Sequence, residues 1–497
     1  FHPKYYFGGI QEIDPKELKL INIKDKTVKG LFWSFVDSIF GQGLQFIIGI
    51  ILARILTPRE FGVIGMMAIF IAISQAFIES GFIQALVRKQ KCTQVDYSTV
   101  FYFNISGSII LYVSLIYFSK SIASFYNEPQ IENLLKVLSL SLIINAFAIV
   151  QRTILTKNIN FKLQTRISML ASISSGAVAI WMAMKGYGVW SLVGLTLVRS
   201  FVTSVFLWVF VQWKPSLIFS KKSFNELFSY GSKLLLSSLI NTSFINIYYL
   251  IIGKYFSVIQ LGYFTRAVQF TELSAKNLTG IINRVTFPVL STLQDNKIAL
   301  KKKYKRIITS SMLISFTLMF GLAAIAEPMV ITLIGEKWRP IIVYLQLLCF
   351  ASSLYPLHSL NLNILKIFGR SDLFLRLEII KIILLIPFIY AGVKFGMLIL
   401  IIGQMLLSLI VYFLNSYWSK SLINYSSMEQ IKDILPSVFI AMGTAGSVFI
   451  LGNYLTINPL LSLFAQIIFG LIIFLILGEI GKNKEYFYIK SIIRQYI

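Results

Sequence analysis

The sequence predicts an all-α polytopic membrane protein with about 14 transmembrane helices, arranged as two six-helix lobes followed by two C-terminal helices. Hydrophobic residues make up 56% of the chain and charged residues only 13%, and the mean hydropathy is +0.74. These values do not suit a water-soluble protein. Apolar runs of about 20 residues, each long enough to cross a bilayer as a helix, recur along nearly the whole length. A residue pattern of the first half also returns in the second.

The elements follow in order from these runs. Residues 1–29 are polar and basic and are expected to form a cytoplasmic leader without a signal peptide, and residues 481–497 a cytoplasmic tail. The first lobe is expected over 30–213, the second over 228–420, and the last two spans over 433–480. The eighth span is the least hydrophobic. The expected spans are 30–53, 61–86, 98–122, 131–151, 163–184, 188–211, 228–252, 261–290, 305–333, 340–365, 373–393, 396–418, 433–452 and 457–478.

The duplication is carried by similar chemistry at matched positions. An apolar run leads to Ala53-Arg54-Ile55-Leu56 and ends at Phe61-Gly62, and a second run leads to Gly253-Lys254-Tyr255-Phe256 and ends at Leu261-Gly262. Each copy holds six spans, an even number, so both copies have the same orientation. The pseudo-twofold axis that relates them must therefore run along the membrane normal. A second echo pairs Arg166 with Arg376 and Gly188 with Gly396, and strict identities are Ser38/Ser238, Ile47/Ile247, Ile51/Ile251 and Gly62/Gly262.

Basic residues predict the orientation. The net charge of +25 could suggest nucleic acid, but in a membrane protein excess Lys and Arg record topology and contact with anionic lipids. Placing the N terminus inside puts most of the 46 Lys and Arg residues into inner segments. We therefore expect both termini to be cytoplasmic, anionic lipids as partners and no nucleic acid. Two Cys and two His residues carry no metal or disulfide pattern.

The eighth span carries the strongest candidate for a functional face. Its polar residues recur at alternating steps of four and three, which places them along one side of a helix, and Arg284 lies beside them. Such a face needs water or polar partners, so we expect it to line a cavity between the lobes. The alternative is that Glu272 and Lys276 only neutralise each other as an i,i+4 pair. The polar residues are Thr265, Gln269, Glu272, Lys276, Thr279, Asn283 and Thr286.

Other spans also contain charges, and charges inside the hydrocarbon region mark functional sites by default. Asp37 lies in the first span, Glu79 in the second and Arg199 in the sixth. An alternative role for Arg199 is a packing contact with a carboxylate such as Glu79. His358 in the tenth span could titrate near neutral pH, although a lone histidine in an apolar helix more often serves packing.

Enzyme signatures are absent from the sequence. No GxxxxGK[ST] motif occurs, which argues against ATP hydrolysis by this chain. No expected outer loop is long enough to form a catalytic domain, and this argues against a membrane glycosyl polymerase. We expect neither an enzyme nor a bound cofactor or metal.

Several short motifs together resemble one family. In order and spacing they are similar to the lipopolysaccharide and exopolysaccharide flippase branch of the multidrug/oligosaccharidyl-lipid/polysaccharide exporter superfamily, over roughly residues 28–420. In that family the position of Glu79 is more usually aspartate, which keeps the charge. The motifs are Glu79-Ser80-Gly81-Phe82-Ile83-Gln84-Ala85-Leu86, Gln151-Arg152, Gly186-Tyr187-Gly188-Val189-Trp190-Ser191-Leu192, Leu261-Gly262-Tyr263-Phe264-Thr265-Arg266-Ala267, Arg284-Val285-Thr286-Phe287-Pro288-Val289-Leu290-Ser291 and Gly335-Glu336-Lys337-Trp338.

The resemblance implies a flippase that moves an undecaprenyl-pyrophosphate-linked oligosaccharide across the bacterial inner membrane by alternating access. It implies a cavity lined by spans 1, 2, 7 and 8, with polymerase and assembly proteins of the pathway as partners. Substrate-binding candidates are Lys276, Arg284, Arg199, Arg54, Arg266, Gln269 and Asn283. Candidates for coupling to H⁺ or Na⁺ are Asp37, Glu79 and Glu272. The alternatives are a multidrug cation antiporter of the same fold and, from another class, a polytopic glycosyl polymerase.

Overall fold

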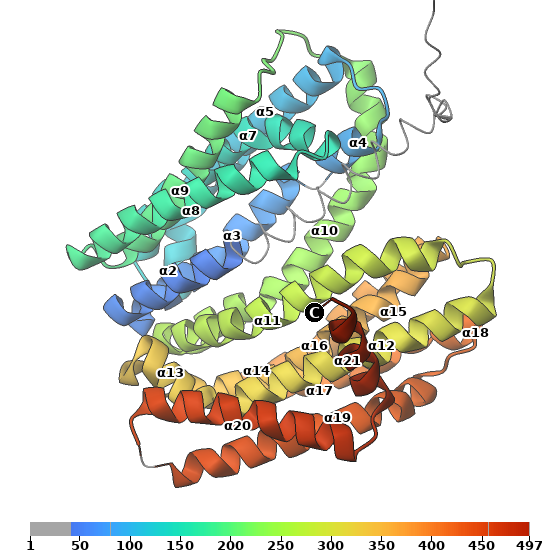
Figure 1. Cartoon of the computed structure of the whole chain (residues 1–497). Coiled ribbons are helices and arrows are strands. Elements are labelled where there is room, and N and C mark those ends of the chain that lie inside the picture. Colours follow the sequence, from blue (N-terminus) through green and yellow to red (C-terminus); the bar gives the residue numbers. More distant parts are fainter. Residues whose placement is uncertain (1–40, 80, 456, 497) are drawn as a thin grey trace, which may run out of the picture.

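The computed structural model describes residues 41–79, 81–455 and 457–496, and the described elements are α-helices with one short 3₁₀ turn. The expected leader, the first part of the first span and Asp37 lie outside the described residues. The predicted all-α architecture is confirmed. Two bundles of long helices converge at one end, where α2 and α11 meet α13, as Figure 1 shows.

Helices of the first lobe match the first six expected spans. The second span continues past the bounds of α3 into α4, and the fourth is divided at Ser139 into α6 and α7. The helices are α2 (Gln42–Ile55), α3 (Pro58–Glu79), α4 (Phe82–Arg88), α5 (Gln94–Tyr126), α6 (Gln130–Leu138), α7 (Leu140–Lys157), α8 (Phe161–Met184) and α9 (Val189–Phe210).

Among the next six spans, the helices of the seventh, eighth, ninth and eleventh extend past both ends of their apolar runs. The seventh begins at Lys221 rather than at 228, and the ninth is divided at Ile325. The helices are α10 (Lys221–Tyr255), α11 (Val258–Ser291), α12 (Lys297–Ala324), α13 (Ala326–Ile334), the 3₁₀ turn η2 (Glu336–Trp338), α14 (Ile341–Ser353), α15 (Tyr355–Ile367), α16 (Ser371–Phe395), α17 (Met397–Ser416) and α18 (Ser419–Ile423).

Three C-terminal helices complete the fold: α19 (Ser427–Tyr454), α20 (Pro459–Ile480) and α21 (Lys484–Tyr496). The long helix α19 packs against α12, and α20 packs against α19 and α13. The two extra spans therefore belong to the outside of the second lobe. The short amphipathic helix α21 lies on α12, where the Arg306 guanidinium stacks over the Tyr488 ring at 4.0 Å.

Apolarity alone does not find every span. Eleven helical segments of the described part are long and apolar enough to cross a membrane, and α11 and α16 are not among them. The eighth span, expected to be the least hydrophobic, is thus not found by its apolarity. The reason is chemical, because each of these helices carries several charged side chains between its ends.

Two glycines at matched positions start the last helix of each lobe. Gly188 precedes α9 with φ +57°, and Gly396 precedes α17 with φ +110°. A side chain at these φ values would strain the backbone, so glycine lets the backbone of each lobe turn into its sixth span. The sequence echo between Gly188 and Gly396 therefore reflects the same turn in both lobes.

The lobes meet in a reciprocal contact between α3 and α11. A Cβ atom added at Gly62 would overlap the carbonyl oxygen of Val258, and one added at Gly262 would overlap the carbonyl oxygen of Pro58. Both glycines and both carbonyls are related by the same shift of 200 positions. The contact therefore lies on the pseudo-twofold axis. It brings two backbones close enough that only glycine fits at either position.

Helix α10 connects the two lobes along its length. It packs against α3, α4 and α5 of the first lobe and against α11 and α16 of the second. Near its start, Gly231 faces Gly81 so closely that each glycine would clash with the other's backbone if it carried a Cβ. Ser223 donates a hydrogen bond of 2.5 Å to the buried carboxylate of Asp96 on α5.

The glycine contact predicts a position-specific effect of adding one methyl group. Gly262→Ala should separate α3 from α11 and lower the melting temperature of the protein in nanodiscs, because overpacking a close contact costs about 1–3 kcal/mol. Gly107→Ala in α5 is the matched control, since no atom lies within 4 Å of its added Cβ. Equal melting temperatures for the two variants would contradict the close α3–α11 contact.

Candidate functional site

The polar face of α11 is divided between two environments. Gln269 and Lys276 are exposed and Glu272 is half-buried, whereas Thr279 and Thr286 are buried. Lys276 and Glu272 form an i,i+4 ion pair of 2.5 Å, with 42% and 39% of their side chains exposed. The self-neutralising pair expected as an alternative therefore exists. The pair leaves this side of α11 polar and accessible, because both charged side chains remain partly exposed.

Towards the C-terminal end, the same face is tied to α15. Asn283 donates to the Ser359 hydroxyl at 2.7 Å and accepts from the Asn363 amide at 2.8 Å. Asn283 is thus hydrogen-bonded within the protein, whereas the Thr286 hydroxyl is buried without a hydrogen-bond partner among the described residues. The side chain of Arg284 lies outside the described residues.

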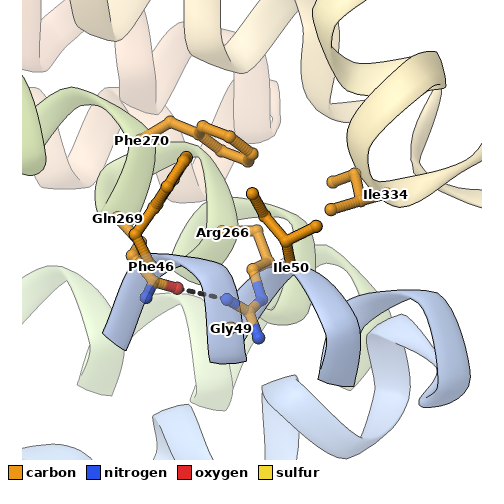
Figure 2. Close-up of a pocket in the computed structure, with 7 residues that line it drawn as sticks. All are labelled: Phe46, Gly49, Ile50, Arg266, Gln269, Phe270 and Ile334. Carbon is orange, nitrogen blue, oxygen red and sulfur yellow. Dashed lines mark hydrogen bonds between the residues drawn. The ribbon is translucent and has the colours of Figure 1, made fainter. Parts of the chain in front are cut away.

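A small pocket lies where the first lobe meets α11 (Figure 2). Its lining comes from α2, α11 and α13, so both lobes contribute to it. Gly49 lies against the guanidinium of Arg266 and the amide of Gln269, which a larger residue there would displace. The lining residues are Phe46, Gly49, Ile50, Arg266, Gln269, Phe270 and Ile334.

Arg266 is the buried cation of this pocket, with 5% of its surface exposed. Its guanidinium lies 3.6 Å from the centroid of the Phe61 ring and donates to the side-chain oxygen of Gln269. Its Nε has no hydrogen-bond partner among the described residues. A guanidinium stabilised by an aromatic face and left with an unused donor can bind an anion, and phosphate oxygens match its geometry.

Arg54 lies outside this pocket and joins the lobes instead. It donates from Nε to the Leu333 carbonyl at 2.7 Å and from Nη2 to the Thr332 carbonyl, both at the end of α13. At the equivalent place of the other repeat, Lys254 donates to the Phe125 carbonyl at 2.6 Å, near the end of α5. In both cases a cation binds the negative end of a helix dipole in the opposite lobe.

Lys337 and Trp338 add a second layer to this junction. Lys337 donates to the carbonyls of Arg54 at 2.8 Å and Leu56 at 2.6 Å, and the Trp338 indole donates to the Ala53 carbonyl at 2.9 Å. We call Arg54, Lys254, Lys337 and Trp338, with the carbonyls that they bind, the carbonyl latch. The latch holds the convergent ends of the two lobes together.

The remaining candidates lie in the first lobe. Glu79 accepts a hydrogen bond from Gln75 and lies 3.9 Å from the Arg152 guanidinium of α7. Asn145, also on α7, donates to Gln75 at 3.4 Å. Arg152 is thus an ionic partner of Glu79, and Arg199 lies half-buried on α9.

Lys337 and Trp338 were not among the site residues predicted from the sequence. The signal that could have identified them is the Gly335-Glu336-Lys337-Trp338 motif. The buried ion pair of Glu378 and Lys381 on α16 was not predicted either.

Comparisons with known proteins agree with this architecture. The chain is 25% identical over 409 residues to the lipopolysaccharide biosynthesis protein WzxC of Escherichia coli K12, covering 80% of this chain and 81% of WzxC. It is 24% identical over 321 residues to the succinoglycan biosynthesis transport protein ExoT of Rhizobium meliloti, covering 64% of each. Among solved structures, the lipid II flippase MurJ in an inward closed conformation superposes with a TM-score of 0.73 at 15% identity, covering 93% of this chain and 100% of MurJ.

A family profile described as polysaccharide biosynthesis protein matches residues 51–343. This match extends over more than half of the chain and includes α3, the carbonyl latch and the polar face of α11. The chain is therefore a multi-pass membrane protein of the polysaccharide biosynthesis protein family.

Proposed function

We propose that this protein is a flippase that moves a polyprenyl-pyrophosphate-linked oligosaccharide from the inner to the outer leaflet of a bacterial inner membrane. The observation that carries the proposal is the buried Arg266, held between two lobes in a member of a polysaccharide biosynthesis family. The names of the relatives support it, because ExoT is a transport protein of polysaccharide biosynthesis and MurJ a lipid II flippase. The protein acts as a transporter and not as an enzyme.

Substrate recognition follows from the charges between the lobes. Arg266 and Lys276, with Arg284 further along the same helix, attract the pyrophosphate, and ionic contacts there are stronger than in bulk water. Gln269 offers its amide group to sugar hydroxyls, and Asn283 would do so by releasing Ser359 or Asn363. The lipid tail stays in the bilayer while the head group follows the polar face of α11.

Transport requires that the lobes rock against each other. With both termini in the cytoplasm, the carbonyl latch lies at the outer end and is closed here, so the head group enters from the inside. Outward opening must break the latch and the α3–α11 contact. Every latch bond joins a side chain to a carbonyl of the opposite lobe, so full outward opening must break all of them.

Energy would come from an ion gradient. Glu79, Glu272 and Asp37 are the carboxylates proposed to exchange H⁺ or Na⁺, and the first two are accessible enough to do so, with 32% and 39% of their side chains exposed. Polymerase and assembly proteins of the pathway would take up the product outside. The exposed Lys302 and Lys303 at the start of α12 would contact anionic lipids.

The function is tested in cells that lack this chain but keep the downstream surface-polymer pathway. Lipid-linked oligosaccharide should accumulate on the cytoplasmic leaflet and be cleared when the wild-type chain is restored, measured by extraction and by accessibility of the sugar to an external probe. If no intermediate accumulates and only sensitivity to toxic cations changes, the protein is a drug antiporter instead.

Arg266→Gln should reduce clearance of the lipid-linked intermediate about tenfold or more, because one charge-assisted contact contributes about 1.5–3 kcal/mol. Its melting temperature should not fall, since the buried guanidinium leaves a donor unsatisfied in the wild type. Arg339→Gln is the matched control, an outer arginine with 53% of its side chain exposed in pairs with Glu327 and Glu336. Full clearance by Arg266→Gln would remove Arg266 from the substrate site.

Lys337→Met should loosen the carbonyl latch and shift the protein toward the outward-open state, because two hydrogen bonds between the lobes are lost. The readout is labelling of Ala53→Cys from outside in a Cys92→Ser, Cys349→Ala background, since Ala53 is fully buried beneath Trp338. Lys394→Met, at the outer end of α16, is the control. Labelling that is as slow in Lys337→Met as in Lys394→Met would refute the latch.

A further inference from the structure

Phe61 of the first lobe contacts two functional groups of the second lobe at once. Its ring centroid lies 3.6 Å from the guanidinium carbon of Arg266 on α11. The same ring lies 5.5 Å from the Trp338 ring, with an interplanar angle of 62°, which is an edge-on arrangement that aromatic pairs favour. Trp338 belongs to the carbonyl latch, because its indole donates to the Ala53 carbonyl at 2.9 Å. One side chain therefore touches both the buried cation and the latch.

The charge of Arg266 depends on this ring. Within the described part of the chain its recorded partners are the Phe61 face and the side-chain oxygen of Gln269, and neither is an anion. An aromatic face attracts a cation through its quadrupole, and more strongly where water is excluded. With the lobes closed, Phe61 thus stabilises the charge in place of a counter-ion.

The other repeat closes the same place with apolar side chains. A shift of 200 positions relates Phe61 to Leu261, and the same shift relates Arg266 to Met66. A Cβ atom added at Gly253 would lie 3.0 Å from Met66 and 3.3 Å from Leu261, so these two buried side chains meet at this glycine. The fold can therefore pack here without a charge. Packing alone does not require the pair of Phe61 and Arg266.

An anion can contact Arg266 fully only when Phe61 moves away. Only 5% of the arginine is exposed while the lobes are closed. The ring covers one face of the guanidinium, and one of its nitrogens is bound to Gln269. A phosphate group that binds a guanidinium through two N–H groups needs room beside them. Phe61 and Arg266 belong to opposite lobes, so separation of the lobes provides that room.

We propose that Phe61 couples anion binding at Arg266 to the opening of the carbonyl latch. With the site empty, the ring holds the cation and keeps α3 against α11. A phosphate or diphosphate group replaces the ring as the partner of Arg266, so it binds the separated lobes more tightly than the closed ones. A ligand with this difference in affinity shifts the protein toward the separated state. The role in transport rests on the proposed flippase function, whereas the effect of an anion on opening does not.

The aromatic contact carries this change to the latch. Arg266 and Trp338 both belong to the second lobe, so separation of the lobes at Phe61 removes the ring from both. The indole then loses the side chain packed against it, and water gains access to the hydrogen bond between Trp338 and Ala53. The empty protein therefore stays closed at its outer end, and arrival of the anionic head group favours opening.

Labelling of Ala53→Cys from outside, in the Cys92→Ser, Cys349→Ala background in nanodiscs, tests this coupling with inorganic pyrophosphate as the probe. Pyrophosphate should accelerate labelling about tenfold, because a desolvated cation–ring contact contributes about that factor to closure. Chloride at the same ionic strength should not accelerate it, and Arg266→Gln should abolish the response to pyrophosphate. Labelling that pyrophosphate leaves unchanged would overturn the proposal.

Phe61→Leu introduces the residue type that the other repeat has at this position. Basal labelling should become about tenfold faster, and the pyrophosphate concentration for half-maximal acceleration should fall by about the same factor, because the binding-competent state is more populated. Phe70→Leu is the matched control on the same helix, since the Phe70 ring lies edge-on to Tyr126 at 6.3 Å and no cation is recorded over it among the described residues. It should leave both values unchanged, and equal effects of the two substitutions would overturn the proposal.

A double-mutant cycle separates the cation–ring contact from packing. In an Arg266→Met background, Phe61→Leu should leave basal labelling almost unchanged, because no cation remains for the ring to hold. The double variant has the apolar residue types with which the other repeat closes, so it should fold. The same acceleration in this background would make Phe61 a packing residue only and refute the coupling. If pyrophosphate acts as expected but lipid-linked oligosaccharide is not cleared in cells, only the flippase function is refuted.

Discussion

The architecture depends on the contact at which α3 and α11 touch through Gly62 and Gly262. Each glycine faces a backbone carbonyl of the other repeat, so the two helices approach more closely than any side chain would allow. This contact places Arg266 of α11 over Phe61 of α3. It also aligns Arg54 and Lys254 with the helix ends that they bind. The pocket and the carbonyl latch are both consequences of one close crossing on the pseudo-twofold axis.

Much of the fold could be predicted from the sequence, because its apolar and polar residues recur at regular intervals. Apolar runs predicted the helices, the shift of 200 residues predicted the axis, and steps of three and four predicted the polar face of α11. The pairing of side chains could not be predicted, since it depends on how each helix is rotated. Glu79 thus lies within ion-pair distance of Arg152, and Lys381 pairs with Glu378 inside α16, and neither contact was predicted from the sequence.

Polar groups inside the helices fall into two physical kinds. Some are satisfied within the protein, such as Asn361, whose side-chain oxygen accepts hydrogen bonds from Tyr304, Ser419 and Gln430 and joins α12, α15, α18 and α19. Others have a buried atom without a hydrogen-bond partner among the described residues, as do Arg266 at Nε and His358 at Nδ1. The first kind gives the second lobe rigidity. The second kind leaves buried polar atoms unpaired, which costs stability.

The carbonyl latch is not symmetric, although the fold around it is. On the α13 side, Arg54, Lys337 and Trp338 together bind five carbonyls, whereas on the α5 side Lys254 binds the carbonyl of Phe125 and lies over its ring. Under a load shared by both sides, the α5 side would part first while the α13 side still holds. The lobes would then rotate apart about the α13 side, and the first opening between them would lie at α5.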